Sequence, residues 1–541
     1  MNVTSDDMNI TSDDMNITSD DTGDSGYEYH VCYYLWCGEA NQEIIFTVCV
    51  WLLVLATFWL GPLYQYLMGL YGDFVGSLRG NDNDSGGALQ IEISTYQGYS
   101  SLADTSKSTF DAPTPQPDRK AVRLDAIGVA RILASVHIVL GHMLNKNIYK
   151  NGEKLLFLTD GVPNLGWGFT WVPWFFMLSG FILTYARLNS SEPGQCDPPL
   201  KFLWKRLASI FPIYAMTLCI TASLVVIHNE QTYRTYHVHF YYSEEYASHY
   251  YSHFPDRWIL CLQSFLLHSF VPQSLEQTFD MHSWFLSALI LYWLGFKFVY
   301  LRMREASFHV TCGMLIALAA IPWGSVMIPP IIGEDQDWYR YHTYFGTDPL
   351  DIWVLILKFH PLCYIHVFVF GMFLARLLLL INTVRDTIPR ALQLMCDYGA
   401  VLGYSVILSL FAIFTPGDVY GKISWRLSVL MPFQGLILLG LSLNKDPLSK
   451  LFQRAPAVVG EASFVQYMIQ FEIYQIWMVR PIDAPYLWFL LSLFGIAVLL
   501  TVWVQKPAIK LWLQNPGYTY AAPFVLLATL LTLREISDSN F

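Results

Sequence analysis

The chain has few charged residues for its length. Asp, Glu, Lys and Arg make up 14% of its 541 residues, whereas a soluble globular chain has about 25%. The formal net charge is −11, so the excess of positive charge that a nucleic acid partner requires is absent. We therefore expect neither a soluble protein nor a nucleic acid partner.

Metal-binding and secretory patterns are missing as well. The nine cysteines show no Cys-x-x-Cys or Cys/His spacing typical of zinc sites, so we expect no metal and no permanently bound cofactor. The first residues are acidic and polar, unlike the basic and then apolar start of a signal peptide. Cys32 and Cys37 share a polar region and are candidates for a disulfide, with two free thiols as the alternative.

The N-terminal tail, residues 1–43, contains a heptad repeated three times (MNVTSDD, MNITSDD, MNITSDD), with one N-x-T sequon per copy at Asn2, Asn9 and Asn16. Such a segment cannot bury enough apolar surface to fold, and its sequons indicate glycosylation in a lumenal or extracellular tail. A duplicated linker with accidental sequons is the alternative. Residues 44–71 form a predicted transmembrane helix, and residues 72–123 a flexible linker.

Apolar segments recur along the rest of the chain, and the 54% hydrophobic composition of the full chain indicates a membrane protein. The sequence predicts an all-α, polytopic transmembrane helix bundle, with about ten helices in the body and one N-terminal helix. The ten predicted body segments are 126–144, 165–186, 207–227, 284–300, 310–330, 353–381, 398–415, 426–443, 459–479 and 486–504. Residues 258–271 are too short to span, and 518–533, within the C-terminal segment 511–541, are borderline.

Loop charges predict the orientation of this bundle. Every second loop is basic, and the cations lie at Arg187, Lys201, Lys205, Arg206, Lys297, Arg302, Arg304, Arg385, Arg390, Lys445, Lys450, Arg454, Lys506 and Lys510. By the positive-inside rule these loops face the cytosol, although the loop 145–163 also carries three lysines. We expect a multi-pass protein of an endomembrane or the plasma membrane, with its N-terminal tail lumenal or extracellular.

Two polar residues interrupt the first body helix. Arg131 and His142 are eleven residues apart, so they fall on one helix face about 16 Å apart along the axis. A bare Arg at the centre of a membrane helix costs about 2.5–3.5 kcal/mol by insertion scales. We therefore interpret the pair as functional. The alternative is an Arg that snorkels to the headgroups and a His that bonds to a neighbouring helix.

Residues 124–510 resemble the acyltransferase 3 family of integral membrane acyltransferases. The resemblance rests on an ordered series of motifs: Arg131-x10-His142, VPWFFMLSGFIL (172–183), KRLASIFPIY (205–214), WFLSALILY (284–292), FGMFLAR (370–376), GEASFVQY (460–467) and Lys506-Pro507. It implies a membrane O-acyltransferase that moves an acyl group, often acetyl, from acyl-CoA as co-substrate to a hydroxyl of a carbohydrate, lipid or small molecule. Besides donor and acceptor, we expect membrane lipids as partners.

The resemblance also suggests roles for individual residues. His142 would be the base that takes the acceptor proton, and Arg131 would orient the donor or stabilise the oxyanion. The candidates for holding the donor are Lys201, Lys205, Arg206, Ser179 and Gly180. The cations could equally be a positive-inside anchor, and the Ser-Gly pair a helix-packing site.

The remaining candidates concern the acceptor side. Trp284 would line an acceptor groove, with an interfacial aromatic belt as the alternative. His253, His282 and His360 are other possible bases, each interpreted first as a structural or interfacial His.

The chain departs from the family pattern in four places. Asp125 lies six residues before Arg131 rather than three before an Arg, and Ser209 replaces the third cation of the basic motif. Leu289 stands where an acid is usual, and Gln470 ends a run in which the family often has His. The lost acid leaves His142 without an evident partner, so a transporter or a catalytically silent membrane scaffold of the same fold stays an alternative.

Overall fold

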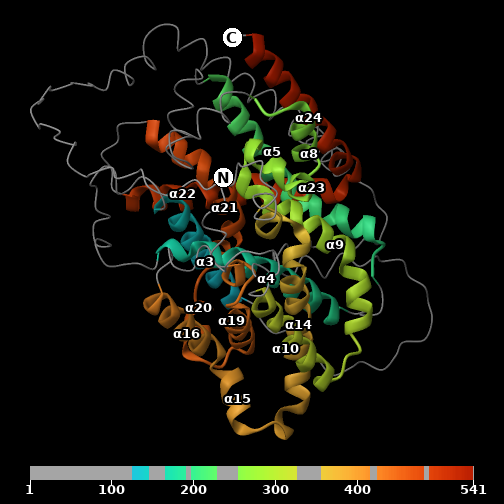
Figure 1. The fold of residues 1–541 in the computed structure, drawn as a ribbon, viewed down its shortest axis with the longest axis vertical. Helices are drawn as coiled ribbons and strands as arrows, with labels where there is room; N and C mark the ends of the chain where they lie inside the picture. Colours follow the sequence, from blue (N-terminus) through green and yellow to red (C-terminus); the bar gives the residue numbers. More distant parts are fainter. Residues whose placement is uncertain are drawn as a thin grey trace, which may run out of the picture.

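The computed structural model describes residues 125–144, 165–190, 196–227, 254–325, 355–414, 423–479 and 486–539. Every regular element within these ranges is a helix, which confirms the predicted all-α class (Figure 1). The N-terminal sequons, the candidate disulfide, the first predicted membrane helix and the linker lie outside the described residues.

Each of the ten predicted body segments contains a helix. These are α3 (Asp125–Leu144), α4 (Trp171–Leu188), α5 (Pro199–Ile227), α9 (Trp284–Met303), α10 (Phe308–Gly324), α14 (Ile365–Val384), α16 (Gly399–Ile413), α19 (Met431–Leu443), α21 (Ala457–Val479) and α22 (Tyr486–Leu500). Among the described residues, six helical stretches are long and apolar enough to cross a membrane, or seven if one bent pair counts as a single span. The chain is therefore a multi-pass membrane protein.

The remaining elements are short, apart from the C-terminal helix. They are η3 (Leu165–Thr170), α8 (Arg257–Ser264), η4 (His268–Phe270), η5 (Pro272–Gln277), η6 (Met281–Ser283), η8 (Pro361–Tyr364), η9 (Arg385–Thr387), α15 (Arg390–Asp397), α18 (Ile423–Arg426), α20 (Pro447–Phe452), η10 (Thr501–Gln505), α23 (Lys506–Gln514) and α24 (Pro516–Ser539). The eight-residue α8 is too short to span, as expected for residues 258–271. The borderline segment 518–533 lies in α24, which is long and apolar enough to span.

Glycines allow three pairs of helices to approach closely. A Cβ added at either member of a pair would overlap backbone atoms of the other helix or press against them. Small residues at such crossings are what permits tight packing in a membrane, where lipid tails are as apolar as Leu. The pairs are α3–α21 (Gly128 and Gly460), α4–α14 (Gly180 and Gly371) and α16–α19 (Gly399 and Gly440).

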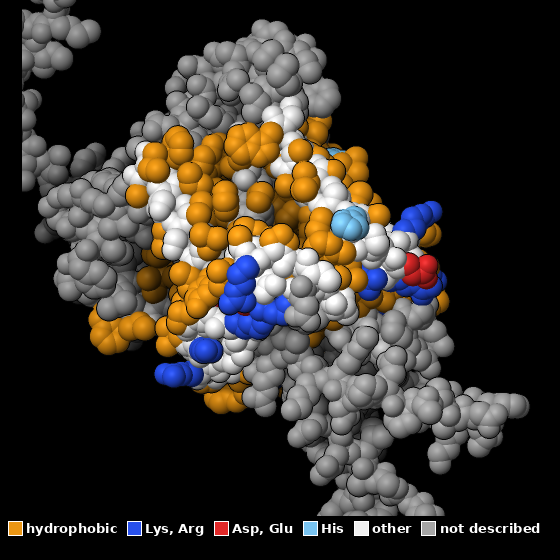
Figure 2. Space-filling view, turned by 90° about the horizontal axis from the view of Figure 1, so that it is seen from below, with side chains coloured by type: hydrophobic (Ala, Val, Ile, Leu, Met, Phe, Trp, Pro, Cys, Tyr) orange, Lys and Arg blue, Asp and Glu red, His pale blue; other side chains and the backbone are white. Residues whose placement is uncertain are grey.

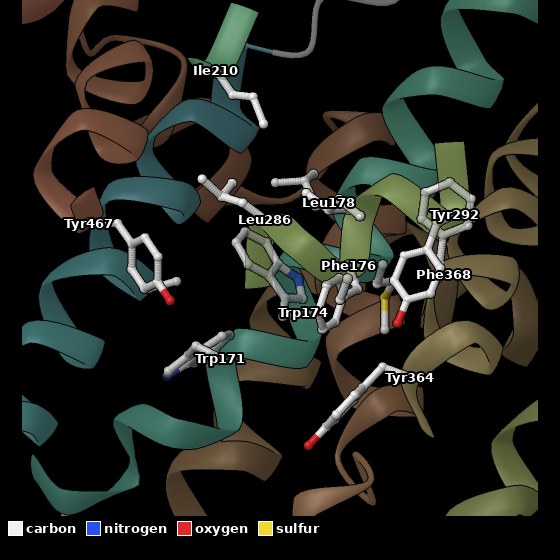
Figure 3. Packing of buried hydrophobic residues seen from close by; sticks show 14 of the residues in the cluster. Trp171, Trp174, Phe176, Leu178, Ile210, Leu286, Tyr292, Tyr364, Phe368 and Tyr467 are labelled. Carbon is white, nitrogen blue, oxygen red and sulfur yellow. The ribbon is translucent and has the colours of Figure 1, made fainter. Parts of the chain in front are cut away.

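Aromatic side chains fill the space between α4, α9 and α14 (Figure 3). The fully buried Phe176 ring lies 5.3 Å from the Tyr292 ring and 5.5 Å from the Tyr364 ring, centroid to centroid. Tyr292 is 5.2 Å from Phe368 and donates its hydroxyl to the carbonyl of Pro361. This layer fixes α9 relative to α14 and η8, and therefore the position of Trp284 at the start of α9.

Residues of three predicted cytosolic loops lie at one end of the bundle. Figure 2 views the end where α15 lies and shows Lys and Arg side chains gathered on a mainly hydrophobic surface. Near α15, Asp397 pairs with Arg385 and Lys445, and Arg376 donates to the carbonyl of Ala306 at 3.1 Å. The predicted orientation requires these loops to share one side.

The C-terminal part of the last helix, α24, packs against residues on the predicted outer side. In Figure 1, α24 lies beside α5 and α8. Arg257 pairs with Glu535 at 2.7 Å, and Arg534 donates to the carbonyl of Pro255 at 2.8 Å. Because α24 follows the predicted cytosolic residue Lys510 and ends beside residues 254–257, it crosses the bundle in the direction that the predicted topology needs.

Candidate active site

His142 lies near the end of α3 and faces α21. Its Nδ1 is 3.0 Å from the side-chain oxygen of Gln470, while the Gln470 amide nitrogen donates to the carbonyl of Tyr467 at 2.8 Å. The carbonyl can only accept, so the amide oxygen is the atom that faces His142. The Nδ1 atom of His142 therefore carries the proton, and Nε2 is left with the free lone pair that a general base needs.

The register between α3 and α21 produces this contact. Ser135 donates to the carbonyl of Ser463, and His142 meets Gln470; both pairs are separated by 328 residues. The offset is constant, so the two helices run parallel, with the glycine contact nearer their starts. Parallel packing agrees with the prediction that both helices leave the same side of the membrane.

A second polar group lies beside His142 and is completely enclosed. His282 Nδ1 is 3.0 Å from Asp280 Oδ1, with side-chain exposures of 5% and 2%, and His282 Nε2 is 3.2 Å from the carbonyl of Met468. Glu472 on α21 accepts a hydrogen bond from Thr221 of α5 at 2.9 Å. The Phe471 ring contacts both imidazoles, with centroids 5.2 Å from His142 and 4.7 Å from His282.

The basic cluster lies at the other end of α5. Lys205 pairs with Asp197 at 2.9 Å and Lys201 with the same carboxylate at 3.6 Å. Burial acts to raise the pKa of Asp197, but the hydrogen bond and charge of Lys205, helped by Lys201 and Arg187, hold it below its ordinary value. Twelve residues separate Lys205 from Thr217, so the cluster lies about 18 Å along α5 from the enclosed polar group.

Arg131 lies near the start of α3. Its side chain is half-buried, and it follows Gly128, where α3 touches α21. The start of α21 is itself charged, because Glu461 pairs with Lys506 of α23 at 2.7 Å. Gln505, next to Lys506, donates to the carbonyl of Ser209 on α5 at 3.5 Å. The helices α3, α5 and α21 thus carry charge near their starts and the His142 cluster near their ends.

A family model described as an acyltransferase domain, that of acyltransferase 3, matches residues 124–506. The chain belongs to the acyltransferase 3 family. The matched region begins at the start of α3 and ends at Lys506, which pairs with Glu461. It therefore contains the charged starts of α3, α5 and α21 as well as the polar residues around His142. In general terms, the protein is a membrane acyltransferase. No curated protein and no solved structure matches the chain.

The other predicted site residues of this acyltransferase lie on α4, α5 and α9, not on the helices that carry His142 and Gln470. Gly180 is pressed against the backbone of α14, so packing accounts for it, and the neighbouring Ser179 is half-buried. Arg206 lies over the Phe202 ring, 5.0 Å from its centroid, close to the basic cluster. Trp284 is 9% exposed and lies 5.4 Å from both Phe359 and Tyr364, so it is a buried residue of the hydrophobic core rather than part of an exposed belt.

The possible alternative bases have different surroundings. His253 lies outside the described residues. His360 caps η8 by accepting from the amide of Leu362, and burial lowers its pKa. His282, interpreted from the sequence as structural or interfacial, is neither isolated nor interfacial, because it joins Asp280 to α21.

Sequence reasoning did not place four residues in this candidate site: Gln470, Asp280, His282 as a paired group, and Glu472. One signal was present, because Glu472 and Gln470 are polar residues inside an apolar helix, as Arg131 and His142 are. Leu289, which replaces the usual acid, is 4% exposed and belongs to the hydrophobic core. The acids of this candidate site are instead Asp280, which directly precedes η6, and Glu472 on α21.

Proposed function

We propose that the protein is a membrane O-acyltransferase that transfers an acyl group, acetyl in the simplest case, from a CoA thioester to a hydroxyl. The acceptor is a carbohydrate, a lipid or a small molecule reached from the outer side. The observation that carries the proposal is the His142–Gln470 pair, because it holds the imidazole with a basic Nε2 in the interior of a membrane acyltransferase.

The reaction needs only one group that accepts and returns a proton. His142 Nε2 takes the proton of the acceptor hydroxyl as its oxygen attacks the thioester carbonyl. The new C–O bond forms, the C–S bond breaks, and His142 gives the proton to the departing thiolate. Donor and acceptor are thereby converted into an ester and free CoA, with no other co-reactant.

Two charged regions, the basic cluster and Arg131, would then bind different parts of the donor. Lys201, Lys205 and Arg206 would hold the CoA phosphates, and Arg131 would bind the donor rather than the oxyanion, since it lies about 16 Å along α3 from His142. An extended CoA thioester suits the similar distance, about 18 Å, between Lys205 and Thr217. This arrangement lets a cytosolic donor meet an outer acceptor within one protein.

The test is acyl transfer by the whole chain in sealed vesicles. Acetyl-CoA labelled in the acetyl group is supplied on the side where Lys205 lies, and label that mild alkali releases is measured in lipid and glycan fractions. We expect alkali-labile ester label that depends on the protein. Label that crosses the membrane without forming an ester would indicate a transporter, and no protein-dependent label would indicate a scaffold.

The partner of His142 can be tested separately. Gln470→Ala leaves Nδ1 without its acceptor, and an unpaired buried polar group costs about 1–3 kcal/mol, so we expect kcat to fall about ten- to hundredfold with little change in KM. The matched control is Gln466→Ala, which removes an equally buried Gln one turn earlier on α21. Equal losses in the two variants would mean that Gln470 has no special role.

The basic cluster predicts an effect on donor binding. Asp197 neutralises Lys201 and Lys205, so Asp197→Asn should strengthen donor binding and Lys205→Ala should weaken it. Half-exposed ion pairs contribute about 0.2–1 kcal/mol, so the KM for acetyl-CoA should change by up to about fivefold in opposite directions. The difference in KM between the two variants should decrease at high salt. A KM that neither variant changes would favour a simple membrane anchor.

A further inference from the structure

The buried His282 has a hydrogen-bond acceptor at each ring nitrogen. Nδ1 lies 3.0 Å from an Asp280 carboxyl oxygen, and Nε2 lies 3.2 Å from the carbonyl of Met468. A neutral imidazole has only one N–H, and a carbonyl cannot donate. Both contacts are hydrogen bonds only if the Asp280–His282 pair holds one more proton than a neutral imidazole and a carboxylate. That proton lies on the imidazole or on the carboxyl.

The surroundings of the Asp280–His282 pair favour retention of its extra proton. Thr217 lies beside Asp280 and Thr221 bonds to Glu472, and these threonines are one turn apart on one face of α5, so the two carboxyl groups are neighbours. Both acids are 2% exposed, and Asp280 Oδ2 and Glu472 Oε2 have no hydrogen-bond partner. Two like charges so close together in a dry interior are costly, so a shared proton stabilises the group.

Hydrogen bonds connect this pair to His142. The Tyr467 hydroxyl donates to the carbonyl of His282 at 2.7 Å, and the His282 ring bonds to the carbonyl of Met468. Two hydrogen bonds therefore hold His282 against α21. The carbonyl of the same Tyr467 holds the Gln470 amide, whose oxygen receives the proton on His142 Nδ1. The turn 467–470 of α21 therefore transmits the position of His282 to His142.

We propose that Asp280 and His282 are positioning residues whose shared proton fixes the 467–470 turn and thereby keeps His142 oriented as a base. This inference rests on the proposed function. When the pH rises and the proton leaves, only one of the two bonds of His282 can persist, and the turn loses one of its supports. Acyl transfer should therefore decline on the alkaline side, through kcat rather than KM.

Several titratable groups face this pair. They are Tyr467 and Glu472 on α21, Tyr214 on α5 and His142 on α3. In addition, the hydroxyl of Ser283, next to His282, lies within hydrogen-bond distance of the His268 ring. Lys358 lies within electrostatic range of His142. Among these groups Glu472 is the one acid, and its negative charge at alkaline pH helps the pair to retain its proton.

The experiment is the dependence of kcat on pH for the full chain in vesicles, with labelled acetyl-CoA. In Asp280→Asn, the amide can donate to Nδ1 while Nε2 donates to Met468, so both bonds form without an extra proton. We expect this variant to lose about two- to fivefold in kcat at neutral pH and to lose the alkaline decline. His282→Gln, which keeps a donor for Met468, should also lack the decline. Glu472→Gln should move the decline to lower pH.

The control is His366→Gln. His366 is as buried as His282, at 6% exposure, and its Nε2 is also 3.2 Å from a backbone carbonyl, that of Leu427. It lies on α14, and this carbonyl belongs to neither α3 nor α21. Its pH profile should match the wild type. A wild-type alkaline decline in Asp280→Asn or His282→Gln would overturn the proposal. If neither variant folds, an unshifted profile in Glu472→Gln would overturn it.

Failure of this inference differs from failure of the proposed function. If the wild-type chain forms no protein-dependent ester, the proposed function is wrong whatever the pH profiles show. If transfer occurs but His142→Asn keeps all of it, His142 is not the base. If His142→Asn is inactive and Asp280→Asn still declines like the wild type, only the positioning role of the pair is wrong.

Discussion

Replacing His142 by Asn should lower kcat for acyl transfer by about 10²- to 10⁴-fold, the range that general base catalysis contributes. Asn can still donate from its amide toward Gln470, but it has no nitrogen lone pair that accepts a proton at neutral pH. The fold should survive, because α3 is held to α21 by Gly128, Gly460 and the Ser135–Ser463 hydrogen bond. The measurement is alkali-labile label per folded protein.

The matched control is His137→Asn on the same helix. His137 is also half-buried and also bonds to a side chain, since Trp171 donates to its Nδ1 at 2.8 Å. It lies five residues before His142, about 140° away around the helix. His137→Asn should therefore reduce stability but leave kcat within about threefold. Full transfer in His142→Asn would remove the proposed base, and equal losses in both variants would make the effect one of packing.

A methyl group at Gly371 or Gly180 should destabilise the protein by about 3 kcal/mol, the upper end of typical overpacking costs. At each position the new Cβ would overlap a backbone carbonyl oxygen, that of Met177 or of Phe368, and neither helix backbone can move without disturbing the aromatic layer behind it. Thermal unfolding in detergent and the yield of folded protein are the measurements. The double variant should cost less than the sum, because both changes separate the same two helices.

The same substitution gives an internal control. Gly295 and Gly313 also lie in predicted membrane helices, but among the described residues no atom of another element lies within 4 Å of a Cβ added there. Gly295→Ala and Gly313→Ala should be neutral or stabilising by up to about 1 kcal/mol, since Ala is the better helix former. A low-cost Gly371→Ala would mean that α4 and α14 are not in close backbone contact.

The fold could be predicted largely from the sequence because the information is local. Runs of apolar residues of membrane length mark the helices, and every body segment from 126–144 to 486–504 contains one. The boundaries differ most where polar or short elements join the spans, as at η3 before α4. Helix α3 was also found by its apolar pattern, although Arg131 and His142 interrupt it.

The site could be predicted only in part because its contacts are not local. His142 was found from its own helix, but its partner lies 328 residues away, and only the register of α3 on α21 brings Gln470 opposite it. The Asp280–His282 pair depends on the path of η6 and on a backbone carbonyl of α21, neither of which has a sequence pattern. The loss of the usual acid at Leu289 did not mean that acids are absent, because Asp280 and Glu472 lie outside α9.

The long separation between His142 and Gln470 also has a consequence for biosynthesis. Ribosomes add about 5–20 residues per second, so the 328 residues between the two side chains take about 16–66 s to synthesise. During that interval α3 enters the membrane with a histidine and an arginine whose α21 neighbours do not yet exist. We therefore expect α3 to reach its final packing, with Gln470 opposite His142, only after the ninth body helix has been inserted.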